Sequence, residues 1–161
     1  MLIELTDEEM LQCDTFAKQV AEAKKGTYGD KFYEMFALGI KGEMVYGKIF
    51  KQDVNFTIYE GKKGDGGTDF KDVNVKTISK AFNTSPWLKV DAFQHKKYKG
   101  VIKKYALVSH VEGNKFEYLG SIDYNRFDKI KRHVIFNKRG KNVVYYVTAD
   151  NLEYNKGLQL V

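Results

Sequence analysis

The stretch GDGGTDFKDVNVKT, residues 64–77, decides how the chain is expected to fold. Its second half alternates between two kinds of side chain: Asp72, Asn74 and Lys76 on the one hand, and Val73, Val75 and Thr77 on the other. Successive side chains of a β-strand point to opposite faces of the sheet, so each set shares a face. We therefore predict a strand with one face in the core and the other in a functional site.

Asp69 precedes this strand and follows the glycine-rich run 64–67. Glycine permits tight turns, so the backbone can bring the Asp69 carboxylate towards the face that carries Asn74 and Lys76. Oxygen ligands bind hard divalent cations, and a lysine offsets negative charge that develops on a phosphate. The pattern favours a metal-assisted phosphoryl-transfer site, and the plain alternative is a hairpin with surface charges.

A further carboxylate comes from the helix predicted over residues 30–51. Glu43 lies on a helical stripe whose other members are apolar or small: Phe36, Gly39 and Ile40. A buried carboxylate is costly unless a cation or a metal pairs with it, so an inward Glu43 would share the site with Asp69 and Lys76. The alternative is that Glu43 extends to water along the flank of the helix.

Helices come first along the chain and strands follow. Thr6 and Glu9 form a capping-box pattern that opens a helix ending near residue 25. Strands are expected at 54–60, 104–111, 114–122, 133–137 and 143–149, with the last four forming two hairpins. We predict an α/β fold in one domain over residues 1–161, with a core at about 28–127 and a C-terminal strand elaboration, including a β-hairpin, at 128–161.

The whole chain has a net charge of +6, and its positive charge is concentrated in the second half. Residues 1–60 carry seven Lys and Arg against eleven Asp and Glu, whereas residues 89–141 carry fourteen against five. The basic residues are interleaved with aromatic ones, which suits a surface that follows a phosphate backbone, although a solvated lysine-rich face has the same composition. We predict DNA contacts at Lys96, Lys97, Lys99, Lys103, Lys104, Lys131, Arg132, Lys138 and Arg139.

Taken in order, these motifs resemble those of the PD-(D/E)xK nuclease superfamily, and in particular its small phage and bacterial members. The segments that carry the resemblance are Gly39–Glu43, Gly64–Phe70 and Asn74–Thr77, followed by the strands KYALVSHV and EYLGSI. The resemblance spans roughly residues 30–125. It implies a restriction-endonuclease-like fold, in which helices flank a central mixed sheet, and a bacterial or phage-infected cytoplasm as the setting.

The resemblance also implies roles for individual residues. Asp69 matches the metal-binding aspartate, Lys76 the catalytic lysine, and Glu43 the helix glutamate that supports the metal. The implied cofactor is Mg²⁺ or Mn²⁺, bound by Asp69, Glu43 and the residue at position 74. The implied activity is hydrolysis of DNA phosphodiester bonds by an endonuclease. The sequence leaves open whether the protein forms a homodimer.

Position 74 departs from the superfamily pattern, because Asn74 stands where an Asp or Glu is expected. An asparagine can still offer a carbonyl oxygen to a cation, but it lacks the negative charge and cannot act as a base. Three explanations are open: an engineered Asp-to-Asn change, a natural variant in which Asp72 or Glu43 supplies the charge, or a degenerate DNA- or protein-binding module. Asp72 lies about 13 Å from Lys76 along an extended chain, by the usual rise per residue.

Other classes of function are not expected. The chain has no apolar run of about 18 residues, and its acidic start does not resemble a signal peptide, so we expect neither a membrane protein nor a secreted one. Cys13 has no second cysteine to pair with and no nucleophile signature, which favours a reducing compartment. The three histidines, His95, His110 and His133, lack metal-ligand spacing and are expected to be structural or exposed.

Overall fold

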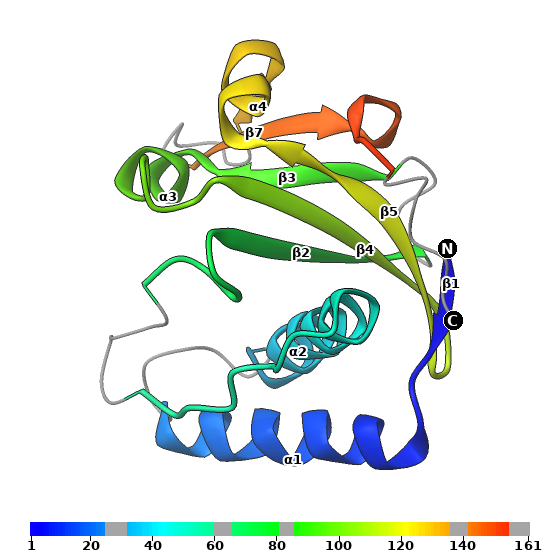
Figure 1. Cartoon of the computed structure of the whole chain (residues 1–161). Coiled ribbons are helices and arrows are strands. Elements are labelled where there is room, and N and C mark those ends of the chain that lie inside the picture. The colour runs from blue at the N-terminus through cyan, green and yellow to red at the C-terminus, as the bar shows by residue number, and fades with distance from the viewer. Residues whose placement is uncertain (25–31, 60–65, 81–85, 136–141, 155–161) are drawn as a thin grey trace.

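The computed structural model describes residues 1–24, 32–59, 66–80, 86–135 and 142–154, which form four α-helices and two β-sheets (Figure 1). The elements are β1 (Leu2–Glu4), α1 (Asp7–Ala23), α2 (Phe32–Phe50), β2 (Val73–Ser79), β3 (Trp87–Asp91), α3 (Ala92–Lys97), β4 (Lys104–Glu112), β5 (Lys115–Asp123), α4 (Tyr124–Ile130), β6 (Arg132–Ile135) and β7 (Val143–Thr148). The predicted mixed α/β class is confirmed. No helix within the described ranges has the length and apolar character needed to cross a bilayer.

Helix α1 begins at the predicted capping box. The Thr6 hydroxyl accepts from Glu9 N at 3.1 Å, and the Glu9 carboxylate accepts from Thr6 N at 2.7 Å, so two N–H groups at the helix start are satisfied. Cys13, Phe16 and Val20 form the buried face of α1 and pack against α2, where Ile40 is 2% exposed. This contact fixes α1 on the outer side of α2, away from the sheet (Figure 1).

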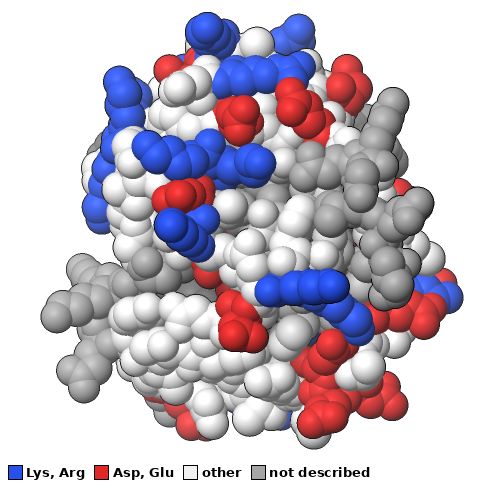
Figure 2. Space-filling view, viewed as in Figure 1, with Lys and Arg blue, Asp and Glu red and all other residues white. Residues whose placement is uncertain are grey.

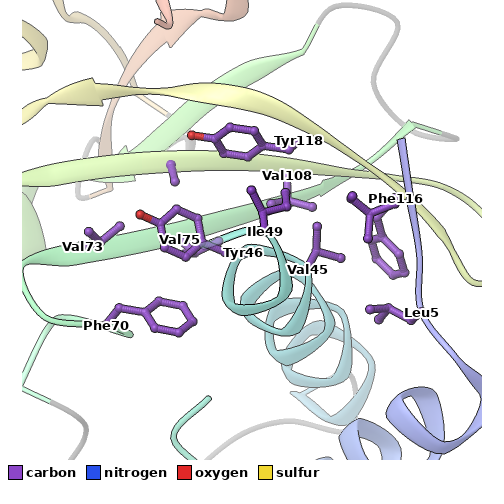
Figure 3. Packing of buried hydrophobic residues seen from close by; sticks show 12 residues of the cluster. Leu5, Val45, Tyr46, Ile49, Phe70, Val73, Val75, Val108, Phe116 and Tyr118 are labelled. Carbon is purple, nitrogen blue, oxygen red and sulfur yellow. The ribbon is translucent and has the colours of Figure 1, made fainter. Parts of the chain in front are cut away.

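The larger sheet has four strands in the order β1-β5-β4-β2. Strands β2 and β4 are parallel, and the other neighbours are antiparallel. Helix α2 covers one face of this sheet through Val45, Tyr46 and Ile49, which pack against Val73 and Val75 of β2 (Figure 3). The predicted burial of the two valines is confirmed, since each is 8% exposed. Strand β2 lies at the edge of the sheet, so one side of its backbone is open for other partners.

The other face of the sheet is covered by a second sheet rather than by long helices. Strands β3, β7 and β6 form an antiparallel sheet that lies with α3 and α4 above β4 and β5 (Figure 1). Leu88, Val90 and Val147 of this sheet share a buried cluster with Tyr105 and Leu107 of β4. The expected mixed sheet with flanking helices is therefore joined by a second sheet that the sequence analysis did not predict. Strands β6 and β7 were expected as an elaboration, but β7 pairs with β3, and β6 pairs with β7 at the edge of this sheet.

The expected strand at 54–60 is wrong over its described part, because residues 54–59 form no regular structure. The alternation has another cause: Val54 and Phe56 turn towards the helices, and the Phe56 ring meets Phe16 of α1 edge to face at 5.2 Å. Residue 60 lies outside the described residues. The expected hairpin of 104–111 with 114–122 is confirmed as β4–β5, and that of 133–137 with 143–149 as β6–β7 for its described residues.

Candidate active site on the β2 hairpin

A tight hairpin leads into β2. Phe70 and Val73 form an antiparallel bridge with N···O distances of 3.1 and 3.2 Å, and the Phe70 ring lies 5.0 Å from that of Tyr46. Asp72 sits in the turn with φ +67°, an uncommon region for a residue with a Cβ. The Asp72 carbonyl accepts hydrogen bonds from Lys103 N at 2.8 Å and from Lys104 N, the first residue of β4, at 3.1 Å. These two bonds hold the turn in this conformation.

Asp69 is held against the open edge of β2. Its Oδ2 accepts a hydrogen bond from the backbone N–H of Val75 at 2.6 Å, and its own N–H donates to Val73 O at 2.9 Å. A charged acceptor strengthens such a bond. The carboxylate is thereby fixed beside the backbone between Asn74 and Lys76, the two residues with which the sequence pattern grouped it.

The side chain of Asn74 is satisfied on one side only. Its Nδ2 donates to Gly67 O at 3.0 Å, whereas its Oδ1 is buried and has no hydrogen-bond partner among the described residues. An acceptor left unsatisfied in the interior costs about 1–3 kcal/mol. Because the amide nitrogen already faces a carbonyl, exchanging the two amide atoms would remove the one bond present. The free oxygen therefore marks a position suited to a ligand that accepts an electron pair.

Gly67 positions this carbonyl through a contact that only glycine permits. Its φ is +94°, and a Cβ built there would lie 2.5 Å from the ring of Tyr98, at the end of α3. The Gly67 backbone therefore lies flat against that ring. The contact joins the hairpin to α3, so the basic residues after α3 lie next to the candidate site.

Lys76 lies on β2 and Glu43 lies on α2. Lys76 shares the strand face of Asn74, and its ammonium group has no hydrogen-bond or ion-pair partner among the described residues. Glu43 is partly exposed on α2, next to Gly42, which packs against Thr77 of β2. No hydrogen bond joins Glu43 to Asn74 or Lys76 in the described part of the chain. The structure thus holds Asp69 at the strand that carries Asn74 and Lys76, whereas Glu43 lies on α2 within electrostatic range of Cys13 of α1.

The oxygen groups of this site fit a hydrated divalent cation. Magnesium keeps several waters and is commonly bound through one or two carboxylates, a role open to Asp69. The Oδ1 of Asn74 is a neutral oxygen that could serve as a further ligand. No group of three His, Cys, Asp or Glu that could hold a metal occurs within the described ranges. The site therefore carries less negative charge than the superfamily pattern implies.

Asp72 does not take the place of the missing acid on the strand. The sequence pattern placed Asp72 on the same strand face as Asn74, but β2 begins at Val73, and Asp72 is the turn residue. The positive φ of Asp72 interrupts the alternation on which that expectation rested. Of the two residues proposed to supply the charge, Glu43 is the one borne by a regular element beside β2.

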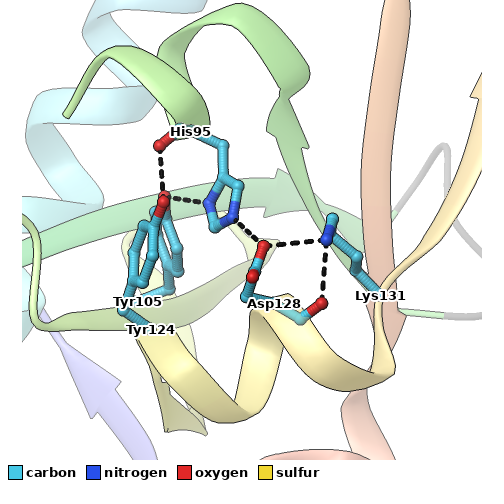
Figure 4. Close-up of polar contacts among 5 residues, drawn as sticks. All are labelled: His95, Tyr105, Tyr124, Asp128 and Lys131. Atoms are coloured by element: carbon cyan, nitrogen blue, oxygen red, sulfur yellow. Dashed lines mark hydrogen bonds and ion pairs between the residues drawn. The ribbon is translucent and has the colours of Figure 1, made fainter. Parts of the chain in front are cut away.

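Of the remaining nucleophile and histidine candidates, Cys13 and His95 are buried, whereas His110 is partly exposed and His133 is exposed. Cys13 is fully buried, and this burial raises the pKa of its thiol to about 12, so the expectation of a poor nucleophile is supported. His95 is 1% exposed and belongs to a polar network (Figure 4). The expectation that His95 is structural is consistent with this burial.

The His95 network joins three elements that lie far apart in the sequence. The hydroxyl of Tyr105 lies 2.9 Å from Nδ1, and Asp128 Oδ1 lies 2.9 Å from Nε2. Since a carboxylate only accepts, Nε2 carries the proton and Nδ1 accepts from Tyr105 in the neutral ring. Lys131 donates to Asp128 Oδ1 at 2.8 Å, and Tyr124 donates to His95 O at 2.8 Å. The network clamps α3 and α4 onto β4, and sequence spacing gave no sign of it.

The predicted DNA-contacting residues fall into two groups. Lys96, Lys97, Lys99, Lys103 and Lys104 lie on α3, in the following turn and at the start of β4, next to the hairpin. Lys131 is engaged by Asp128 and lies 4.9 Å from the Tyr145 ring, and Arg132 is exposed on β6. Lys138 and Arg139 lie outside the described residues. On the face shown in Figure 2, many basic side chains lie in the upper half, with some acidic ones among them, and a group of acidic side chains lies at the lower right.

The chain matches no protein-family model, and neither a curated protein nor a solved structure is significantly similar to it. The functional assignment therefore depends on the residues of the site and their geometry.

Proposed function

We propose that the chain is a DNA-binding domain on a restriction-endonuclease-like scaffold, with a metal-dependent phosphodiesterase site at the β2 hairpin that is weakened by Asn74. One observation carries the proposal: the buried Oδ1 of Asn74 has no hydrogen-bond partner in the described part of the chain, and it lies on the strand against which Asp69 is fixed. A hydrophobic residue or a paired amide would satisfy a purely structural position better.

The arrangement of the elements supports this assignment. A long helix packs on a mixed sheet, a tight hairpin leads into the edge strand, and that strand carries the polar alternation. These placements support the proposal. The second sheet over the other face is an addition to the expected scaffold. Strand β2 pairs with β4 along one edge of its backbone, and the hairpin with Asp69 lies along the other edge.

The residues of the site have separable tasks in this proposal. A divalent cation, when bound, supplies Lewis acidity and a more acidic water. Asp69 offers a carboxylate whose direction is fixed by the Val75 N–H, and Lys76 places an ammonium group where it can offset charge on a phosphate. Asn74 contributes a neutral oxygen and cannot accept a proton.

The second candidate function is DNA binding without cleavage. The observation that favours it is the charge deficit at position 74, because one carboxylate and one amide attract a divalent cation less strongly than two carboxylates. Both functions place DNA on the basic surface around α3 and the start of β4. A plasmid-nicking assay of the chain and of Asn74→Asp, with Mg²⁺ and with Mn²⁺, separates the two.

The setting and the assembly belong to the same proposal. The single cysteine, free and buried in α1, suits the reducing cytoplasm of a bacterium or a phage-infected cell. A homodimer stays a prediction.

A further inference from the structure

A hollow of about 570 Å³ lies between the turn after α3 and the start of α4. Four cationic side chains and one carboxylate line it: Lys99, Lys103, Arg126, Lys129 and Asp123. Arg126 and Lys129 belong to the basic second half of the chain, but the β4–β5 hairpin separates them in sequence from Lys99. Only the fold brings the two basic segments together.

The walls of the hollow are held by backbone hydrogen bonds and a buried anchor. Lys103 N donates to Asp72 O at 2.8 Å, and Lys103 O accepts from Tyr124 N at 2.8 Å. Ile102, which precedes Lys103 in the turn, is packed in the core and only 3% exposed. The loop is therefore fixed to the β2 hairpin on one side and to α4 on the other, and its cationic side chains extend from a rigid base.

Most of the positive charge in the hollow is uncompensated. The ammonium groups of Lys99, Lys103 and Lys129 form no ion pair or hydrogen bond among the described residues. Arg126 pairs through Nη1 with Glu153 Oε1 at 2.6 Å. Like charges gathered in one concave surface raise the local potential and attract an anion.

The hollow lies close to the candidate site. Asn74 and Tyr105 are register partners on β2 and β4, and Lys103 is two residues before Tyr105. That displacement is about 7 Å along the strand by the usual rise per residue. It is on the scale of one to two nucleotides of one DNA strand, which rises about 3.4 Å per nucleotide along the helix axis.

We propose that this hollow binds a phosphate group of the DNA strand, one to two nucleotides from the phosphate held at the β2 hairpin. The proposal rests on the proposed function for the identity of the polyanion. The phosphate is either an internal phosphodiester or a terminal phosphomonoester, since both present the same oxygen atoms to ammonium groups. Held there, it would set the register of the strand relative to Asp69 and Lys76.

The test compares two charge-matched double variants in the absence of divalent metal. Lys99→Gln/Lys129→Gln removes two charges from the hollow, and Lys18→Gln/Lys51→Gln removes two from exposed positions on and after the N-terminal helices. Binding of a fluorescein-labelled duplex is followed by anisotropy over a range of salt concentrations, with circular dichroism as the folding check. We expect the hollow variant to bind several-fold more weakly, with a log–log salt slope smaller by about 0.9 for each phosphate that the variant no longer neutralises.

A duplex with a 5′-phosphate and one with a 5′-hydroxyl distinguish the two sources. Tighter binding of the phosphorylated end, abolished in the hollow variant, indicates a terminal phosphate, and equal binding indicates an internal one. Equal affinity and slope in the two double variants would overturn the proposal. This outcome is separate from nicking, because Asn74→Asp can cleave whether or not the hollow binds, and the hollow can bind while Asn74→Asp stays inactive.

Discussion

Asn74 and Tyr105 are direct partners in the parallel register of β2 and β4, so the amide of the candidate site lies beside the residue whose hydroxyl reaches His95. Tyr105 is fully buried, and the network continues to Asp128 and Lys131 (Figure 4). The same strand pair therefore holds the site and the clamp that positions the basic helices. Damage to the clamp should weaken DNA binding without removing any group of the site.

The protonation of His95 should lower stability in mild acid. Burial lowers the pKa of His95 below its usual value of 6.5, and Asp128 partly opposes this shift. The unfolded chain therefore binds a proton at a pH at which the folded chain does not, so the free energy of unfolding falls as pH drops below about 6.5. Urea denaturation from pH 7.5 to 5 measures this fall, and NMR titration measures the His95 pKa directly.

Removal of the Asp128 carboxylate should move the His95 pKa further down. Asp128→Asn keeps the shape of the side chain but removes the charge that favours the imidazolium. A His95 pKa that rises in this variant, or that equals 6.5 in the parent, would contradict the account of the network.

The approach of α2 to β2 should be sensitive to one methyl group. A Cβ at Gly42 would overlap Thr77 Oγ1 and lie 2.9 Å from Thr77 Cβ, so rotation of the threonine cannot relieve the overlap. Gly42→Ala should lower the free energy of unfolding by about 1–3 kcal/mol through overpacking, despite the better helix propensity of alanine. The replacement Thr77→Ala should restore part of this stability.

Gly39 provides the control in the same helix. A Cβ there would have no neighbour within 4 Å beyond its own helix, so Gly39→Ala should gain up to about 1 kcal/mol from helix propensity alone. Chemical denaturation of both variants measures the two changes. Equal stability changes at positions 39 and 42 would show that α2 does not approach β2 as described.

The bond between Asp69 and Val75 should contribute to the stability of the hairpin. Asp69→Ala removes the acceptor from a backbone N–H at 2.6 Å, and hydrogen bonds to charged groups contribute about 1.5–3 kcal/mol. Asp69→Asn keeps an acceptor and should be less destabilised. Urea midpoints of the two variants give the comparison. An Asp69→Ala protein as stable as the parent would show that the Asp69 carboxylate does not bind this edge of β2.

Much of the fold could be predicted from local pattern. The capping box at Thr6 and the β4–β5 hairpin depend on residues close in sequence, and both were found where expected. The alternation at 54–59 failed, because a period of two also arises when a chain packs irregularly on helices, as Phe56 does on Phe16. The pairing of β3 with β7 joins residues about sixty positions apart, and no local signal encodes such a pairing.

The site was predicted in its members more than in its geometry. Val73 and Val75 are buried, and Asp69 lies at the strand that bears Asn74 and Lys76, as the alternation indicated. Asp72 was expected on the strand face of Asn74, but its positive φ places it in the turn before β2. The position of Glu43 depends on where α2 crosses the sheet, which helical periodicity alone does not fix.

The most direct measurement is the nicking of supercoiled plasmid by Asn74→Asp, compared with the parent chain and with Asn74→Asp/Lys76→Met. Asp and Asn have nearly the same volume, so the substitution adds charge with little change in packing. We expect Asn74→Asp to nick DNA with Mg²⁺ or Mn²⁺ at least roughly tenfold faster than the parent, and EDTA or Lys76→Met to abolish the activity. A folded Asn74→Asp protein that binds DNA and leaves the plasmid intact with both metals would contradict the phosphodiesterase site.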